Sequence, residues 1–217
     1  MAKKRKKTGV KEKSKESNEM LLKKRQTESQ SKILKGFLIG MAVLLIFIVL
    51  FVYGIKLTKK FQYEGVNFEI VKTGNLVLYN TKLPLVVDGK KAEYNFYLRN
   101  DPRKIGEDVP FNGTLIMKSN MVVNVSSSLN CDGDGIIGLA NVVGLYKVIG
   151  TNVIRDENAS CDPAGRYVYL NILEGNETSV EQVGSACYNI NINNCEILKG
   201  TERFMVESLV KVNEIIS

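Results

Sequence analysis

The pattern of apolar and polar positions is dominated by one segment. Residues 36–55 read GFLIGMAVLLIFIVLFVYGI, twenty positions without a charged side chain. At about 1.5 Å rise per residue, a helix of this length spans a hydrocarbon core of about 30 Å. A helix in a soluble core normally keeps a polar stripe, which this segment lacks. We therefore predict a single transmembrane helix over 36–55.

A cleaved secretory signal is the main alternative for this segment. Such signals have a shorter apolar region, about 7–15 residues, and end in a small-x-small site, which FVYGIK at 51–56 does not offer. Lys32, Lys35 and the run KKRKK outweigh Lys56, Lys59 and Lys60 on the other side. The positive-inside rule then places the N-terminus in the cytoplasm and the rest outside, in a single-pass protein of the cell membrane.

The rest of the chain alternates between strand and helix patterns. Strands are predicted over 66–71, 75–79, 83–87, 92–99, 114–124, 152–154, 167–173, 179–183 and 187–192. Asp88-Gly89 is a turn signal, so the third and fourth runs form a hairpin. Helices are predicted over 135–150, with Asp134 near its N-cap, and from about Thr201 to the end. The pattern indicates an α+β fold, a mixed sheet covered by two helices.

Charge and apolar pattern together give four regions: a basic flexible cytoplasmic tail (1–35), the span (36–55), a linker (56–62) and an extracytoplasmic α+β domain (63–217). The tail holds 13 basic and 4 acidic residues. Subtracting these from the totals of 30 and 23 leaves 17 basic and 19 acidic residues beyond it. The net charge of +7 therefore belongs to the tail, where topogenic charge or contact with anionic lipid explains it, and we expect no specific nucleic-acid partner.

All four cysteines lie on the predicted outer side, where disulfides form and persist. They are Cys131, Cys161, Cys187 and Cys195. Four cysteines allow three connectivities. Only seven residues separate Cys187 from Cys195, so we expect a local loop there and a second bond between Cys131 and Cys161. A zinc site is the alternative, but it favours C-x2-C spacings that the sequence lacks.

The same region carries four N-x-S/T sequons, each a candidate glycosylation site. They begin at Asn112, Asn124, Asn158 and Asn176. Because none precedes the apolar segment, they agree with the predicted orientation. An Asn-rich sequence also produces such triplets by chance.

Two short patterns suggest ion contacts. Asn130, Asp132 and Asp134, with Gly135 behind them, resemble the start of the calcium loop of EF-hand and dockerin modules. The closing ligand is missing, since position 12 is Asn141, and a helix N-cap with a tight Gly turn explains the same residues without an ion. Arg99 and Arg103 flank an Asn-Asp-Pro turn and form either an anion clamp or a solvated Asx-type turn.

Catalytic signals are weak. The chain has no His, which excludes His-based triads, imidazole metal ligands and His proton shuttles. A Ser-Lys pair, a free thiolate or two carboxylates would remain, but no spacing points to one of them. The sequence contains no P-loop motif. We expect no enzyme activity and no cofactor.

Two resemblances bear on the class of protein. Lys35-Gly36-Phe37-Leu38 resembles the processing signal of type IV pilin-like proteins, with cleavage after Gly36, although Met41 stands where bacterial pilins carry Glu. The stretches YNFYLRNDPR (94–103) and CYNININNCEILKGTERF (187–204), with the tail-and-span layout, resemble uncharacterised single-pass membrane proteins of archaea. That resemblance implies a shared architecture over 32–217 and no known activity.

The sequence therefore predicts a membrane-anchored structural or interaction module whose partners are the lipid bilayer and an unidentified protein or surface. A pilin-like subunit and a surface enzyme without His chemistry are the alternatives.

Overall fold

A computed structural model describes residues 35–54, 59–87, 89–126, 129, 131–156 and 158–216. The chain divides into two compact units, Met1–Leu57 and Thr58–Ser217. The first unit contributes one described element, the helix Lys35–Gly54, which agrees with the predicted helix within one residue at each end. All its side chains are exposed, and it is long and apolar enough to cross a membrane. Residues 1–34 of the predicted tail lie outside the described residues.

The second unit begins with a four-stranded antiparallel sheet. Its strands follow one another in the order β1 (Lys60–Tyr63), β2 (Val66–Thr73), β3 (Leu76–Val87) and β4 (Lys90–Leu98). Alternation of apolar and polar residues sets the faces, because Phe68 on β2 and Phe96 on β4 are buried while their strand neighbours are more exposed. The β3–β4 hairpin turns at Gly89, as predicted, where φ is +74°.

A six-stranded mixed sheet forms the other side of the unit. Its order is β5-β9-β10-β8-β6-β7, with strands β5 (Phe111–Asn112), β6 (Asn120–Val125), β7 (Asn152–Arg155), β8 (Val168–Glu174), β9 (Ser179–Gly184) and β10 (Cys187–Ile192). Only the β9–β10 pair is antiparallel. The inner side chains of the central strands, such as Leu170, Ile172 and Ile190, are fully buried.

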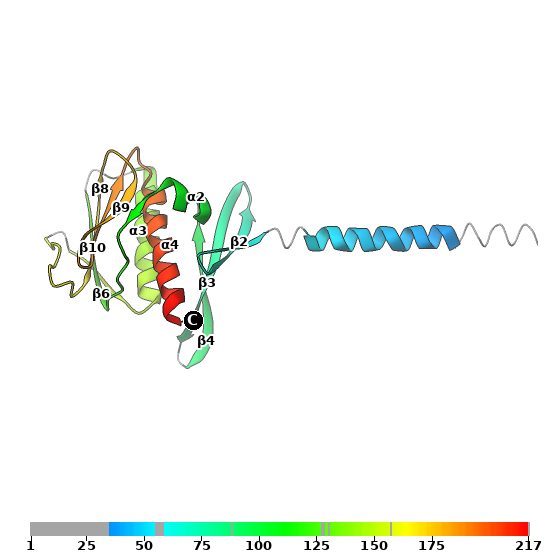
Figure 1. The fold of residues 1–217 in the computed structure, drawn as a ribbon, viewed down its shortest axis with the longest axis horizontal. Coiled ribbons are helices and arrows are strands. Elements are labelled where there is room, and N and C mark those ends of the chain that lie inside the picture. The colour runs from blue at the N-terminus through cyan, green and yellow to red at the C-terminus, as the bar shows by residue number, and fades with distance from the viewer. Residues whose placement is uncertain are drawn as a thin grey trace, which may run out of the picture. The chain divides into compact units, whose positions relative to one another are not determined.

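Helices α3 (Asp134–Val148) and α4 (Ile197–Ile216) lie between the two sheets (Figure 1). One core cluster joins residues of both sheets with Leu145 of α3 and Phe204 of α4. The domain therefore has three layers, sheet, helices and sheet. The predicted α+β class is confirmed. The prediction of a single mixed sheet is wrong, because α4 carries apolar residues around much of its surface and buries them against a sheet on each side.

The predicted linker 56–62 also needs correction, because β1 starts at Lys60. Phe61 and Tyr63 alternate along β1 and pack against the core, so this short segment adds a strand. Likewise 75–79 and 83–87 belong to one strand, β3, in which Pro84 lies beyond the part paired with β2. The predicted strand 114–124 shrinks to β6, and the sequence reasoning missed α2 (Pro102–Asp108) and β5.

Helix boundaries differ slightly from the prediction. Helix α3 follows a short 3-10 turn, η1 (Cys131–Gly133). Its N-cap is Gly133, where φ is +89°, and Asp134 comes directly after it, near the N-cap as predicted. Helix α4 starts at Ile197, four residues before Thr201.

Candidate functional site

A cleft opens where β2 separates from β3. The last β2–β3 pair is Phe68 with Thr81, after which residues 82–87 of β3 pair only with β4. At the same point Val66 and Asn67 pair with β1 instead. The wedge between the strands holds about 660 Å³, and Leu209, Asn213 and Ile216 near the end of α4 also line it.

Asn80 is the polar group of interest in the cleft lining. The residue is 7% exposed, and its Nδ2 donates to Asn95 Oδ1 at 3.3 Å. Its Oδ1 is buried and has no hydrogen-bond partner among the described residues. Nearby, Lys82 and Glu93 form an ion pair of 2.8 Å across the β3–β4 hairpin. The cleft lining therefore combines apolar side chains with Lys82, and the Asn80 oxygen is a buried acceptor without a partner among the described residues.

A buried carboxylate fixes the segment that follows β4. Glu202 on α4 is fully buried, and its carboxylate accepts hydrogen bonds from the backbone N–H of Arg99 at 2.6 Å, and from the backbone N–H and Nδ2 of Asn100 at 3.0 and 2.8 Å. Burial raises the pKa of Glu202, while these donors act in the opposite direction. All its contacts are internal, so Glu202 positions the loop. The sequence signal was a Glu between Leu198 and Met205 on an apolar stripe.

The two arginines predicted as an anion clamp are both paired internally. Arg103 forks onto Asp101 at 2.9 and 2.6 Å and lies 4.1 Å from the ring centroid of Phe61. Hydrogen bonds from Arg103 hold the pKa of Asp101 below its usual value. Arg99 pairs with Asp134 at 3.2 Å. Asp101 also accepts from the Arg103 backbone N–H as the N-cap of α2, so the predicted Asx-type turn is confirmed as a helix start.

This pairing also bears on the calcium candidate. Asn130 lies outside the described residues. Asp134 is at the first turn of α3 and shares its carboxylate with Arg99, and Asp132 is exposed with a φ of +47°. Among the described residues no three acidic or sulfur ligands gather as a metal site would require. The structure joins one residue of each candidate site, Arg99 and Asp134, in an ion pair.

The four cysteines form two disulfides, as predicted, but with a different pairing. Cys131 is bonded to Cys195, and Cys161 to Cys187. The predicted local bond between Cys187 and Cys195 is wrong because Cys187 begins strand β10 and Cys195 follows its end, which holds them apart along the strand. Cys131–Cys195 joins the starts of α3 and α4, and Cys161–Cys187 ties the β7–β8 loop to the six-stranded sheet.

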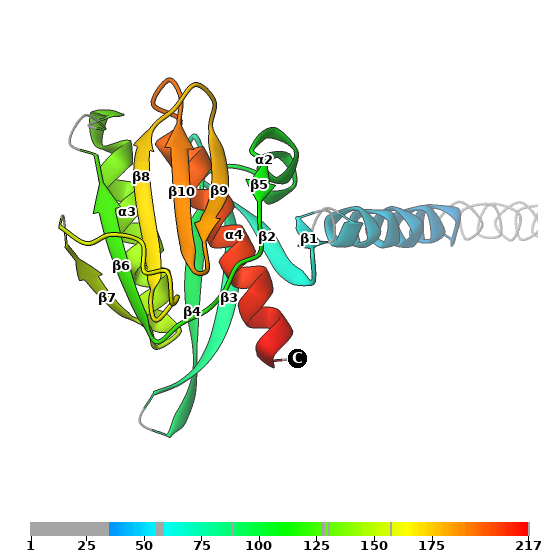
Figure 2. The ribbon, with the colours of Figure 1, turned by 60° about the vertical axis from the view of Figure 1, so that its left-hand side comes forward.

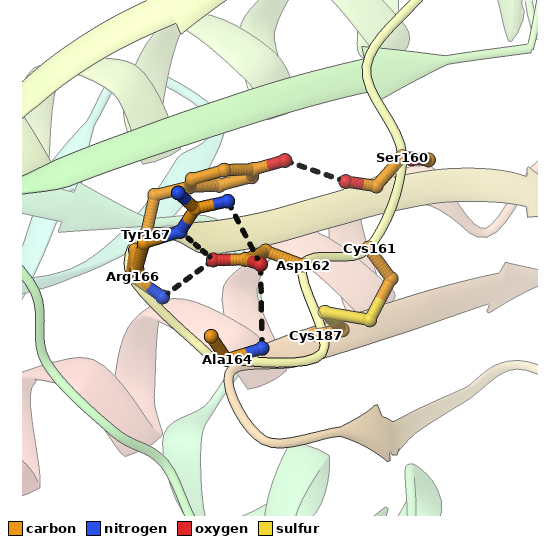
Figure 3. A network of polar contacts seen from close by, with 7 residues as sticks. All are labelled: Ser160, Cys161, Asp162, Ala164, Arg166, Tyr167 and Cys187. Carbon is orange, nitrogen blue, oxygen red and sulfur yellow. Dashed lines mark hydrogen bonds and ion pairs between the residues drawn. A yellow bond between two sulfur atoms is a disulfide. The ribbon is translucent and has the colours of Figure 1, made fainter.

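A polar network stiffens that loop (Figure 3). The Asp162 carboxylate accepts from the Arg166 side chain at 2.8 Å and from the backbone N–H groups of Arg166 and Ala164 at 2.9 and 3.3 Å. These bonds lower the pKa of Asp162 to about 2. Tyr167 donates to the Ser160 carbonyl at 2.7 Å. The loop is therefore pinned at Cys161 and at Asp162.

Three of the four sequon asparagines are exposed: Asn112, Asn158 and Asn176. Asn124 is half-buried on β6, and its Nδ2 lies 3.5 Å from the Tyr169 hydroxyl. Comparison with known proteins gave no match to a protein-family model, to a curated protein or to a solved structure. The function of this chain therefore has to be inferred from its own residues.

Proposed function

We propose that this chain is a single-pass membrane protein whose residues 58–217 form an extracytoplasmic binding module. The helix Lys35–Gly54 carries the proposal. Its most apolar window has a mean hydropathy of 2.8, and every side chain is exposed, so it has no protein surface to cover it among the described residues. A long run of exposed apolar side chains is costly in water and favourable in a bilayer.

Charge and redox chemistry support the orientation. The excess of Lys and Arg on the N-terminal side favours a cytoplasmic N-terminus. Both disulfides lie in the domain on the other side of the helix, and disulfides persist in oxidising compartments.

The buried charged side chains favour binding over catalysis, because they are already engaged in hydrogen bonds within the protein. Glu202 and Asp162 each accept several internal hydrogen bonds, and Arg203 donates to the Val109 carbonyl and to Glu207. Such groups hold loops in place. The cleft lined by Asn67, Lys82 and Leu83 is instead open to a ligand.

Trypsin treatment of membrane vesicles from the native host tests the orientation. Lys56, Lys59 and Lys60 provide cleavage sites between the helix and the domain. We expect right-side-out vesicles to release the disulfide-bonded domain and inverted vesicles to lose only the basic tail. Release of the domain from inverted vesicles, or from neither kind, would contradict the proposal.

Intact mass of the same protein separates the pilin-like alternative. A mass that begins at Phe37 would favour processing after Gly36. A full-length mass, about four hydrogens lighter than the reduced form, supports an uncleaved anchor with two disulfides. The resemblance to archaeal membrane proteins stays a prediction.

A further inference from the structure

The outer face of the six-stranded sheet carries a row of polar side chains in register across five strands. Asn124 on β6 pairs with Asn171 on β8, which pairs with Asn189 on β10. Asn189 pairs with Glu181 on β9, and Glu181 pairs with Asn112 on β5. We call these five residues the amide row. Figure 2 looks toward this sheet with α3 and α4 behind it.

The alternation of the strands places the amide row away from the core. Leu170 and Ile172 flank Asn171 and are fully buried in the main core cluster. Tyr188 and Ile190 flank Asn189 in the same way. Because successive side chains point to opposite faces of a sheet, the amides must point outward. Asn112 is exposed, and the other four are half-buried, as expected on a flat sheet face.

These side chains serve no visible structural purpose. Asn171, Asn189 and Glu181 make no side-chain hydrogen bond with any described residue, and Asn124 makes only the long contact to Tyr169. By contrast, Asn120 on β6 and Asn152 on β7 of the same sheet are joined by a side-chain hydrogen bond of 3.4 Å. Asn is depleted in strands, so unpaired amides on central strands are unfavourable for folding alone. Residues that contradict the preference of their secondary structure are found mostly at functional sites.

The chemistry of the row defines its ligand. Each amide presents two donors and an acceptor oxygen side by side, which matches neighbouring hydroxyl groups. Strands lie about 4.8 Å apart, close to the length of one sugar unit, so a chain of sugars laid across the strands meets one polar side chain per unit. The row carries a single charge, the carboxylate of Glu181, which disfavours a polyanion.

A wall borders the row on the side of the β7–β8 loop. Tyr169 precedes Asn171 by two residues on the same face, and Val122, Tyr169 and Cys187 form a small apolar cluster with Tyr167 and Cys161 of the loop. The Cys161–Cys187 disulfide and the Asp162–Arg166 network hold this loop in place. Tyr169 and Cys187 are buried, so half-buried Tyr167 is the aromatic side chain of this edge that can pack on the apolar face of a sugar ring.

We propose that the amide row is a binding site for a neutral, hydroxyl-rich polysaccharide. The proposal goes beyond the proposed function, because it adds a second binding site on the six-stranded sheet, and it rests on that function only for the extracytoplasmic placement. It is measured on purified protein, so its outcome is independent of the vesicle test of orientation.

The experiment is calorimetric titration of the full chain in lipid nanodiscs with cellohexaose, mannohexaose and chitohexaose. We expect a dissociation constant of about 1 mM or lower for at least one of them. Asn171→Ala with Asn189→Ala should weaken it at least tenfold. These two positions are outside the sequons, so any attached glycan is unaffected. Asn75→Ala, an exposed asparagine in the β2–β3 turn of the other sheet, is the matched control and should bind like the wild type.

A second pair of substitutions guards against misfolding. Asn171→Asp with Asn189→Asp keeps the side-chain shape but removes the donors, and should also weaken binding at least tenfold. Wild-type binding by either double variant would overturn the proposal. The proposal would also be overturned if the wild-type protein bound none of the three sugars. If, in addition, sedimentation showed that Asn171→Ala with Asn189→Ala converts a dimer into a monomer, the face would be a self-association surface instead.

Discussion

Replacing Glu202 with Gln tests whether the buried carboxylate fixes the loop after β4. The side chain is fully buried and receives three donors, one from Arg99 and two from Asn100. A glutamine has one acceptor oxygen, so in its better orientation it still turns an NH₂ group toward the Arg99 N–H. One buried donor left unsatisfied costs about 1–3 kcal/mol. We expect the free energy of unfolding to fall by about 2 kcal/mol.

For a domain of this size, about 2 kcal/mol corresponds to a melting temperature lower by about 4–8 °C. Near-ultraviolet circular dichroism of the full chain in detergent can follow the transition, since the chain has nine Tyr and no Trp. The matched control is Glu214→Gln on the same helix, whose exposed ion pair with Lys211 is worth at most about 1 kcal/mol. The reasoning is refuted if Glu202→Gln melts at the wild-type temperature.

The pH dependence of this difference follows from the raised pKa of Glu202. A carboxyl whose folded pKa lies above its unfolded pKa contributes stability that is fully present below the unfolded value, and this contribution is lost as the pH rises through the folded value. The free energy of unfolding of the wild type should therefore rise relative to that of Glu202→Gln as the pH is lowered toward the unfolded pKa of about 4.3. Melting curves at several pH values would contradict this if the difference between the two proteins grew with rising pH.

Three further predictions concern packing, acid stability and the disulfides. Gly138→Ala should destabilise the domain by about 1–3 kcal/mol, because the added carbon would lie 2.6 Å from the Thr201 hydroxyl. Gly144→Ala on the same helix meets no atom within 4 Å and should stabilise the domain by up to about 1 kcal/mol. Thermal melts of the two variants check both signs. The lowered pKa of Asp162 stabilises the wild type above about pH 4, and this contribution is lost as the pH falls to about 2. Asp162→Asn has no carboxyl to protonate there, so its free energy of unfolding should fall less than that of the wild type over this range. Replacing both Cys131 and Cys195 with Ser should cost about 4 kcal/mol by the loop-entropy relation for a separation of 64 residues, measured by denaturant titration; a smaller effect than from the 26-residue Cys161–Cys187 pair would contradict the estimate.

The features that could be predicted from the sequence are those set by local pattern. The apolar helix, the β3–β4 turn at Gly89 and α3 all follow from runs of one residue class or from a turn signal. The second sheet could not be predicted, because strand signals along the chain do not state which strands pair. The disulfide pairing failed for the same reason, since closeness in sequence says little about closeness in space once a strand intervenes.

The candidate sites were also beyond local reasoning. The sequence reasoning singled out Arg99, Arg103 and Asp134, which neutralise charges within the protein. Asn80 and the amide row were missed, because an asparagine in a strand becomes informative only when its face and its cross-strand neighbours are known. The regular spacing of asparagines in YNININN at 188–194 was a usable signal, since it places Asn189 and Asn191 on one face.

The position of α4 between the sheets has a consequence for biosynthesis. This helix follows every strand in the chain order, yet it supplies the layer against which both sheets bury their inner faces. Until it has been synthesised, α3 is the only helix of the middle layer, and Cys131 gains its partner thiol only when Cys195 follows. The three-layer core and the Cys131–Cys195 bond can therefore form only late in synthesis, so the yield of folded domain should depend on keeping Cys131 reduced until then.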